Sequence, residues 1–345
     1  MIEQIKKYLE SWETKNVTSM LETLHPTNFG IRTYETKRVL SKKELNEEIL
    51  NSKILKYDIV NYSNKGETYF VKLLLKTEND EFNIETRFTF RDNAIKKVFE
   101  VIEDDSVRIM CRLSYDGSRY FGFQKQNNAL TIQGTIEKAL KEITKEDISI
   151  HASGRTDKGV HALNQVFHFD TLSNIVPENF YQLLNKYLPE SIRVLSSKQV
   201  NKTFHSRYDV KTKEYKYIIS LTEVNVIENS YEWFPGKFDL SRFKQELKDV
   251  IGTHNFSSFT KTNSSTSFIR TIYSAKIEEK NDKLVIYIKG NGFLRYMVRN
   301  IIAALIVISN KRENFTIKSL IKAQDNSLLR DIAPSNGLYL NNVEY

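Results

Sequence analysis

Hydrophobic positions near the amino terminus recur at helical spacing. Ile2, Ile5 and Leu9 lie three or four residues apart, which predicts an amphipathic helix. Ser41 begins a second predicted helix as its cap, and Glu44 stands three residues later, where it completes a capping box. The chain therefore begins with two predicted helices.

Four runs rich in β-branched and aromatic residues follow these helices, with Asn, Asp and Gly at the turns between them. They predict strands at 57–63, 68–76, 82–91 and 94–101. Two helices before four consecutive strands predict a small α+β domain with a meander sheet over residues 1–105. This order weakly resembles the SnoaL/NTF2-like domains of the cystatin/NTF2-like class. No group of candidate catalytic residues is visible in residues 1–105, so the role and the partner of this domain are unknown.

From residue 106 the pattern takes the order β-α-β-β-α-β, which is that of a ferredoxin-like unit. The predicted strands are 107–113, 148–152, 165–170 and 192–196, and the predicted helices are 131–144 and one that opens at Pro177. These elements form the first half of the second domain, residues 106–210.

The same order repeats over residues 211–345, the second half of that domain. The predicted strands are 214–221, 269–279, 284–290 and 338–343, and the predicted helices are 240–251, closed by Gly252, and 294–309. Two such halves predict one extended, mainly antiparallel sheet with helices on one side. We expect a central cleft at the junction of the halves, and an α+β fold class for the whole chain.

Composition narrows the class of protein. The chain has 345 residues, of which 40% are hydrophobic and 27% charged, as in a folded protein of about two domains. The longest apolar run, 301–308, is far shorter than the roughly 18 residues of a membrane span. The charged amino terminus is unlike a signal peptide, and Cys111 is the only cysteine. We therefore expect a cytoplasmic protein without disulfides or membrane association.

Charge is divided unevenly along the chain, whose net charge is +8. Residues 1–105 carry a net charge of −2, whereas residues 106–345 carry +10. A polyanionic partner would therefore bind the second domain. Basic side chains around a cleft in a sheet suit a folded RNA.

Several signals of cofactor chemistry are absent from the sequence. It contains no phosphate-binding loop that ends in Gly-Lys-Ser/Thr, no dinucleotide fingerprint and no His-Glu-x-x-His zinc helix. Gly290-Asn291-Gly292 fits a turn after a strand. We expect neither a cofactor nor a metal.

One loop between predicted strands stands out, at 152–162. Gly154 and Gly159 bracket Arg155 and Asp157, so the backbone can turn sharply while both charged groups reach one space. The same residues also suit a tight turn in which Asp157 binds local amides and Arg155 is solvated. Residue types alone do not decide between these two interpretations.

The segment Gly-Arg-Thr-Asp-Lys-Gly-Val-His-Ala at 154–162 resembles the catalytic loop of the TruA-type tRNA pseudouridine synthases. Further blocks resemble that family in the same order along the chain, from residue 107 to the end. They are 115–124 with 131–133, 204–207, 213–217, 254–259, 297–300 and 333–338. The resemblance does not extend to residues 1–105.

The resemblance implies a cofactor-free isomerase, an intramolecular transferase that converts uridine to pseudouridine. It implies action on the anticodon stem-loop of tRNA, at positions 38, 39 and 40, and a homodimer. Asp157 would be the essential carboxylate, Arg299 its ion-pair partner, and Tyr215 a pocket residue that stacks on uracil. Tyr217, two residues later, is expected to pack in the core.

The resemblance also suggests electrostatic contacts with RNA. Arg155, Lys158, His161 and Arg207 are the candidates, although His161 suits a hydrogen-bonded structural role equally well. Two alternatives stay open, a non-catalytic RNA-binding protein on the same fold and a pseudouridine synthase that acts on another RNA. Retention of Asp157, Tyr215 and Arg299 argues against the first, because a pure binder needs no carboxylate beside RNA phosphate.

Overall fold

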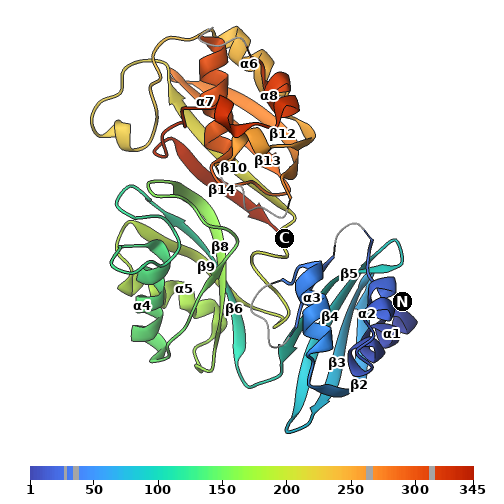
Figure 1. Cartoon of the computed structure of the whole chain (residues 1–345). Helices are drawn as coiled ribbons and strands as arrows, with labels where there is room; N and C mark the ends of the chain where they lie inside the picture. The colour runs from blue at the N-terminus through green and yellow to red at the C-terminus, as the bar shows by residue number, and fades with distance from the viewer. Residues whose placement is uncertain (27–28, 34–38, 262–266, 311–314) are drawn as a thin grey trace. The chain divides into compact units, whose positions relative to one another are not determined.

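The computed structural model describes residues 1–26, 29–33, 39–261, 267–310 and 315–345. The chain divides into two compact units (Figure 1). The first comprises residues 1–107 with 201–204, and the second comprises residues 108–200 with 205–345. The short segment 201–204 belongs with the first unit, where the Lys202 ammonium donates to the carboxylate of Asp104.

The first unit combines helices with a five-stranded sheet of order β1-β5-β4-β3-β2. Its elements are α1 (Ile2–Glu13), α2 (Val17–Thr23), β1 (Gly30–Arg32), α3 (Lys42–Leu50), β2 (Ile54–Lys65), β3 (Thr68–Thr77), β4 (Glu81–Arg91) and β5 (Ala94–Ile102). Both predicted helices and the meander of four strands are confirmed, and the capping box of Ser41 and Glu44 is present. Helix α2 and strand β1 were not predicted, because seven and three residues are too few to establish a period.

The second unit is built on a nine-stranded sheet of order β11-β12-β13-β10-β14-β8-β6-β9, with β7 paired to β8. Up to residue 200 its elements are β6 (Val107–Tyr115), α4 (Ile132–Thr144), β7 (His151–Ala152), β8 (His161–Thr171), α5 (Phe180–Tyr187) and β9 (Ile192–Val200). From residue 205 they are β10 (Thr212–Ser220), α6 (Leu240–Lys248), β11 (Gly252–Asn255), β12 (Ile269–Lys280), β13 (Lys283–Gly290), α7 (Met297–Ser309), α8 (Ile317–Ala323) and β14 (Leu338–Glu344).

The parallel pairing of β14 with β8 joins the strands of both predicted halves into one sheet. Tyr339 lies opposite His161, and Leu340 lies opposite Ala162. This contact also places the start of β8 beside β14, which itself pairs with β10. The mixed α+β class is confirmed, and segments far apart in the sequence meet at this point of the sheet.

Several predicted boundaries were wrong. Helix α6 ends at Lys248 rather than Ile251, and Gly252 begins β11 with a φ of +123° instead of closing the helix. Helix α7 begins three residues later than predicted, because Tyr296 has a left-handed φ of 64°. Strand β7 keeps only two of its five predicted residues. Helix α8 and strand β11, both short, were not predicted.

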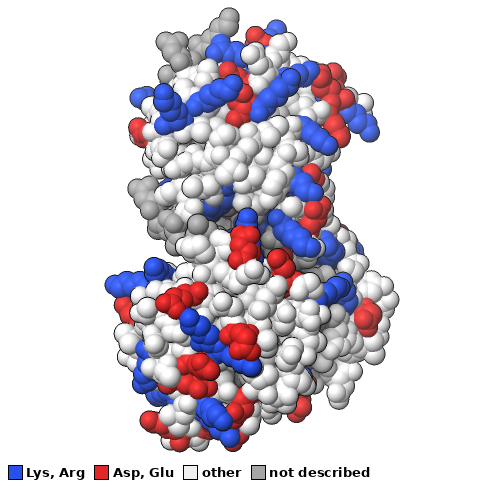
Figure 2. Space-filling view, turned by 90° about the vertical axis from the view of Figure 1, so that its right-hand side faces the viewer, with Lys and Arg blue, Asp and Glu red and all other residues white. Residues whose placement is uncertain are grey.

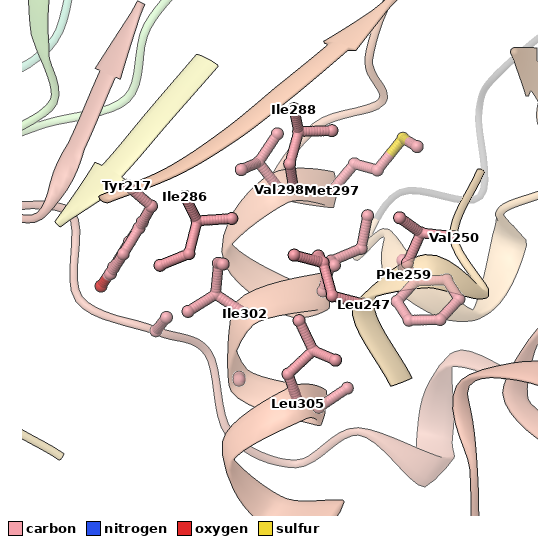
Figure 3. Packing of buried hydrophobic residues seen from close by; sticks show 14 of the residues in the cluster. Tyr217, Leu247, Val250, Phe259, Ile286, Ile288, Met297, Val298, Ile302 and Leu305 are labelled. Carbon is pink, nitrogen blue, oxygen red and sulfur yellow. The ribbon is translucent and has the colours of Figure 1, made fainter. Parts of the chain in front are cut away.

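Helix α7 packs its apolar side chains against β10 and β13. Figure 3 shows Val298 beside Ile288 and Ile302 beside Ile286, in the core that also contains Tyr217. The side chain of Tyr217 is 1% exposed, which confirms its predicted place in the core. The apolar run 301–308 lies within this helix, and no described helix is long and apolar enough to cross a bilayer. This packing fixes the start of α7, where Arg299 lies.

Candidate active site

The loop that carries Asp157 lies between β7 and β8, and both sides of it are anchored. The Val160 N–H donates to the Asp157 carbonyl oxygen at 3.1 Å and closes a turn. Before Asp157, the Thr156 carbonyl accepts from the Phe123 N–H at 3.1 Å. The Thr156 hydroxyl lies 2.8 Å from the hydroxyl of Tyr115. Asp157 is therefore held by backbone contacts rather than left on a free loop.

Two glycines before α4 let the chain lie directly against this loop. A Cβ on Gly117 would lie 2.0 Å from the Val160 carbonyl oxygen. A Cβ on Gly122 would lie 2.9 Å from the Thr156 carbonyl oxygen, and its φ is +91°. Both distances are shorter than van der Waals contact allows, so any larger residue would displace the loop that carries Asp157.

Replacement of Gly117 by alanine is expected to lower the free energy of unfolding by about 1–3 kcal/mol, because the added methyl group overpacks the loop. We expect the catalytic rate to fall as well, since Val160 closes the turn around Asp157. Gly292→Ala is the matched control, because its Cβ would meet nothing closer than 3.9 Å. Urea denaturation and single-turnover kinetics measure both effects. A Gly117→Ala protein as stable and active as the control would contradict this packing.

Asp157 and Arg299 form an ion pair. Oδ2 of Asp157 lies 3.5 Å from Nη1 of Arg299, and their side chains are 28% and 14% exposed. Nε of Arg299 donates to the Ala333 carbonyl oxygen at 2.7 Å, which fixes the guanidinium. The arginine is the third residue of α7, so the helix start aims it at the loop.

Burial and charge act in opposite directions on Asp157. Burial raises the pKa of this carboxyl, while the charges of Arg299, Arg295 and Arg155 lower it. Burial has the larger effect, and the pKa lies above its ordinary value. The result is a poorly hydrated carboxylate beside guanidinium groups, which suits a nucleophile or a group that stabilises a developing cation.

Tyr215 comes to this site from β10, where the β10–β14 pairing shifts register between Glu214 and Tyr215. Its ring meets Phe293 edge to face, with centroids 5.1 Å apart. Burial, together with the Tyr115 and Asp157 side chains, raises the pKa of Tyr215, so its hydroxyl stays protonated at neutral pH. The structure thus brings Asp157, Arg299 and Tyr215 together. Their spacing in the sequence gives no sign of this.

Three of the predicted RNA contacts present cationic groups to solvent. Nη1 of Arg155 donates to Oε1 of Gln124 at 2.7 Å. Nζ of Lys158 lies 4.1 Å from the centroid of the half-exposed Phe121 ring. The guanidinium of Arg207 lies 5.7 Å from the ring centroid of its neighbour Tyr208.

His161 has a different environment. Its side chain is 2% exposed, and Nδ1 accepts from the Gly117 N–H at 3.1 Å. Nε2 lies 3.0 Å from the Ser230 carbonyl oxygen, and the ring stacks on Tyr339. Burial lowers the pKa of His161, so the ring is neutral at neutral pH. This is the setting of a structural histidine, the alternative left open by the sequence.

Sequence reasoning missed two cations at the site. Arg295 acts electrostatically on Asp157, and Lys213 donates from Nζ to the Ser153 carbonyl oxygen at 2.6 Å. Lys213 stands two residues before Tyr215. Because side chains alternate along a strand, the two lie on the same face of β10. That spacing was the available signal for Lys213. No comparable signal marked Arg295.

Solved structures of NTF2-like proteins are similar to about a third of this chain. An NTF2-like protein of unknown function from Cytophaga hutchinsonii covers 30% of this chain and 88% of its own, with 11% identity and a TM-score of 0.27. A SnoaL-like polyketide cyclase from a Jannaschia species covers 30% and 84%, with 12% identity and a TM-score of 0.26.

Sequence relatives match this chain at much higher identity. Proteins named tRNA pseudouridine synthase A are 38% identical over 234 residues in Aster yellows witches'-broom phytoplasma and 40% identical over 245 residues in Bacillus pumilus. These matches cover 68% and 69% of this chain, and 96% and 99% of the relatives. A family model described as tRNA pseudouridine synthase matches residues 113–209 and 247–345. The chain therefore belongs to the tRNA pseudouridine synthase family.

Proposed function

We propose that this protein isomerises uridine to pseudouridine in the anticodon stem-loop of tRNA, at positions 38, 39 and 40, with Asp157 as its essential carboxylate. The supporting observation is the ion pair between Oδ2 of Asp157 and Nη1 of Arg299, which lie 3.5 Å apart. Asp157 lies on a loop that is anchored on both sides, and Arg299 lies in α7. Family membership supports the reaction and the class of substrate. The three positions and the roles of individual residues are our inference.

The reaction itself explains why such a carboxylate is needed. The bond from N1 of uracil to C1′ of ribose breaks, C5 then bonds to the same carbon, and the C5 hydrogen leaves as a proton. N1 gains a proton, so atoms balance without a redox step or a second substrate. Asp157 would either attack the nucleoside covalently or stabilise the cation that forms at C1′. Both roles require the ionised carboxylate and the exclusion of water.

Arg299 and Tyr215 would support this chemistry in different ways. The guanidinium of Arg299 favours the ionised form of Asp157 against the effect of burial. The ring of Tyr215 would stack on the flipped-out uracil, and its protonated hydroxyl could exchange a proton with the base. Neither role needs a cofactor or a metal.

RNA would be held through phosphates and shape, because the deep major groove of A-form RNA hides base edges from side chains. Arg155, Lys158 and Arg207 are the proposed contacts, and His161 stays a less favoured prediction because its nitrogens are already engaged.

We further propose that the second domain consists of two ferredoxin-like halves around a central basic cleft, and that the protein forms a homodimer. On the face shown in Figure 2, acidic side chains lie among the basic ones, so this face is a poor candidate for a basic surface that binds RNA.

The alternatives predict different products. A non-catalytic RNA-binding protein would leave uridine unchanged, and a synthase for another RNA would modify that RNA instead. The ion-paired Asp157 argues against the first alternative, because a pure binder does not need it. A synthase for another RNA would use the same carboxylate, so only the identity of the modified RNA separates it from the proposal. The amino-terminal unit enters neither argument, and its role stays open.

Chemical mapping of pseudouridine at single-nucleotide resolution tests the proposal. Transcribed tRNAs that carry one uridine each, at position 38, 39 or 40, are incubated with the purified protein. We expect pseudouridine at each position, and none in a tRNA whose only uridines lie outside the anticodon stem-loop. The same mapping is then applied to total RNA incubated with the protein. Pseudouridine only in another RNA would favour the synthase for another RNA, and no pseudouridine at all would favour the non-catalytic RNA-binding protein.

A further inference from the structure

Lys213 is a partly buried cation that forms no ion pair in the described structure. Among the residues that the structure describes, its ammonium donates to the Ser153 carbonyl oxygen at 2.6 Å, and no carboxylate pairs with it. Some other shielded cations of the same unit do have carboxylate partners. Arg108 binds Asp170 at 2.6 Å, and Lys283 binds Glu232 at 2.7 Å. Lys213 differs from these two in that a single backbone carbonyl compensates its charge.

The position of this ammonium points to the catalytic site. Lys213 and Tyr215 share one face of β10. Nζ rests against Gly154, where an added Cβ would lie only 2.7 Å away. The charge thus lies at the beginning of the loop that ends in Asp157, on the same side as the pocket tyrosine. One hydrogen bond to Ser153 leaves ammonium donors available.

The electrostatic environment is unfavourable for a cation in the absence of RNA. Burial and the charge of Arg207 together lower the pKa of Lys213 to about 8. A shielded ammonium costs free energy unless an anion or several acceptors compensate it. A second cation increases that cost. Within the described part of the chain neither cation forms an ion pair with a carboxylate, so Lys213 and Arg207 together form an electropositive site that a bound anion would stabilise.

We infer that Lys213 and Arg207 together bind one RNA phosphate, that of a nucleotide adjacent to the uridine on which Asp157 acts. This inference rests on the proposed function, since it takes the substrate to be RNA. A phosphate carries the charge that two cations require, whereas the oxygens of uracil are neutral. The Ser153 carbonyl orients the lysine, and the arginine can meet the phosphate with its planar fork.

Binding measured over a range of salt concentrations tests the inference. Lys213→Met in the full chain is expected to raise the Kd for an anticodon stem-loop RNA roughly tenfold, the effect of one charge-assisted hydrogen bond. The slope of log Kd against log salt should fall by about 0.7–1, which is the contribution of one phosphate. Lys216→Met is the matched control, because it removes the same charge from the opposite face of β10. It should leave the slope unchanged.

A modified RNA separates a phosphate contact from a structural effect. A stem-loop with one uncharged methylphosphonate next to the target uridine should bind wild type more weakly than the unmodified RNA. Lys213→Met should lose less affinity on the same change than wild type does, because only the contact from Arg207 is left to lose. Lys213→Arg should keep the sensitivity. If Lys213→Met fails to fold, the methylphosphonate series with wild type and Lys213→Arg still decides.

The pH dependence gives a third measure. The Lys213 ammonium loses its proton as pH rises through its lowered pKa of about 8. Wild-type affinity should therefore be full below that pH and weaken above it, and Lys213→Arg should remove this loss. An unchanged salt slope, or equal methylphosphonate effects in wild type and Lys213→Met, would overturn the phosphate site. Because binding is measured apart from turnover, such a result would leave the proposed isomerisation standing.

Discussion

Replacement of Asp157 by asparagine should slow pseudouridine formation by about 10⁴-fold or more, as expected when an essential catalytic group is removed. Asparagine keeps the size of the side chain but has neither the charge nor the nucleophilic oxygen. The loop should stay in place, because its anchors use backbone groups and the Thr156 hydroxyl rather than the Asp157 side chain. tRNA affinity should therefore be retained.

Single-turnover kinetics with enzyme in excess measure the rate, and fluorescence anisotropy measures the affinity. Asp147→Asn is a suitable control, because this exposed carboxylate pairs only with Lys141 in the described structure. It should match wild type in both assays. An Asp157→Asn protein that has also lost tRNA binding would point to a structural role for the carboxylate.

Replacement of Arg299 by glutamine is expected to lower the rate about 10²–10³-fold, as does the loss of one preorganised electrostatic contact. It should also change the pH profile. Burial already holds the pKa of Asp157 above its ordinary value, and Arg299 is the first of the groups that oppose it. Without Arg299 the pKa rises further. Activity needs the ionised form, so the acidic limb of the profile should move to higher pH.

Arg295→Gln provides the graded comparison. Arg295 also lowers the pKa of Asp157 but forms no ion pair with it in the described structure, and its side chain is exposed. Its loss should shift the acidic limb in the same direction by less. Rate profiles between pH 4 and pH 8 compare the three proteins. Identical acidic limbs in Arg299→Gln and wild type would rule out the proposed electrostatic role.

Long periodic elements were predictable from the sequence. The alternating apolar positions of β4 and the apolar face of α4 repeat often enough to define a period, and both elements are observed. Short elements were not, because α2 and β11 contain too few residues for a period. The end of α6 was misplaced because Asp249 caps it in helical geometry, and Gly252 suits either a helix end or the left-handed start of a strand.

The candidate site was predictable only where its chemistry is local. Two glycines around Arg155 and Asp157 mark the loop within a few residues. The contact of Asp157 with Arg299 joins residues 142 positions apart, and family resemblance rather than spacing suggested it. The neutral state of His161 depends on its burial, to which segments distant in the sequence contribute. The contact of Lys213 with Ser153 joins residues of β10 and of the loop before Asp157, which are distant in the sequence, so it could not be predicted from spacing.

Release of tritium from tRNA labelled at C5 of uridine tests the central claim most directly, because the C5 hydrogen must leave when that carbon bonds to ribose. Wild-type protein should release one tritium into water for each pseudouridine formed at positions 38–40, and Asp157→Asn should release none on the same timescale. Equal release by the two proteins would contradict the assignment of Asp157 as the catalytic carboxylate.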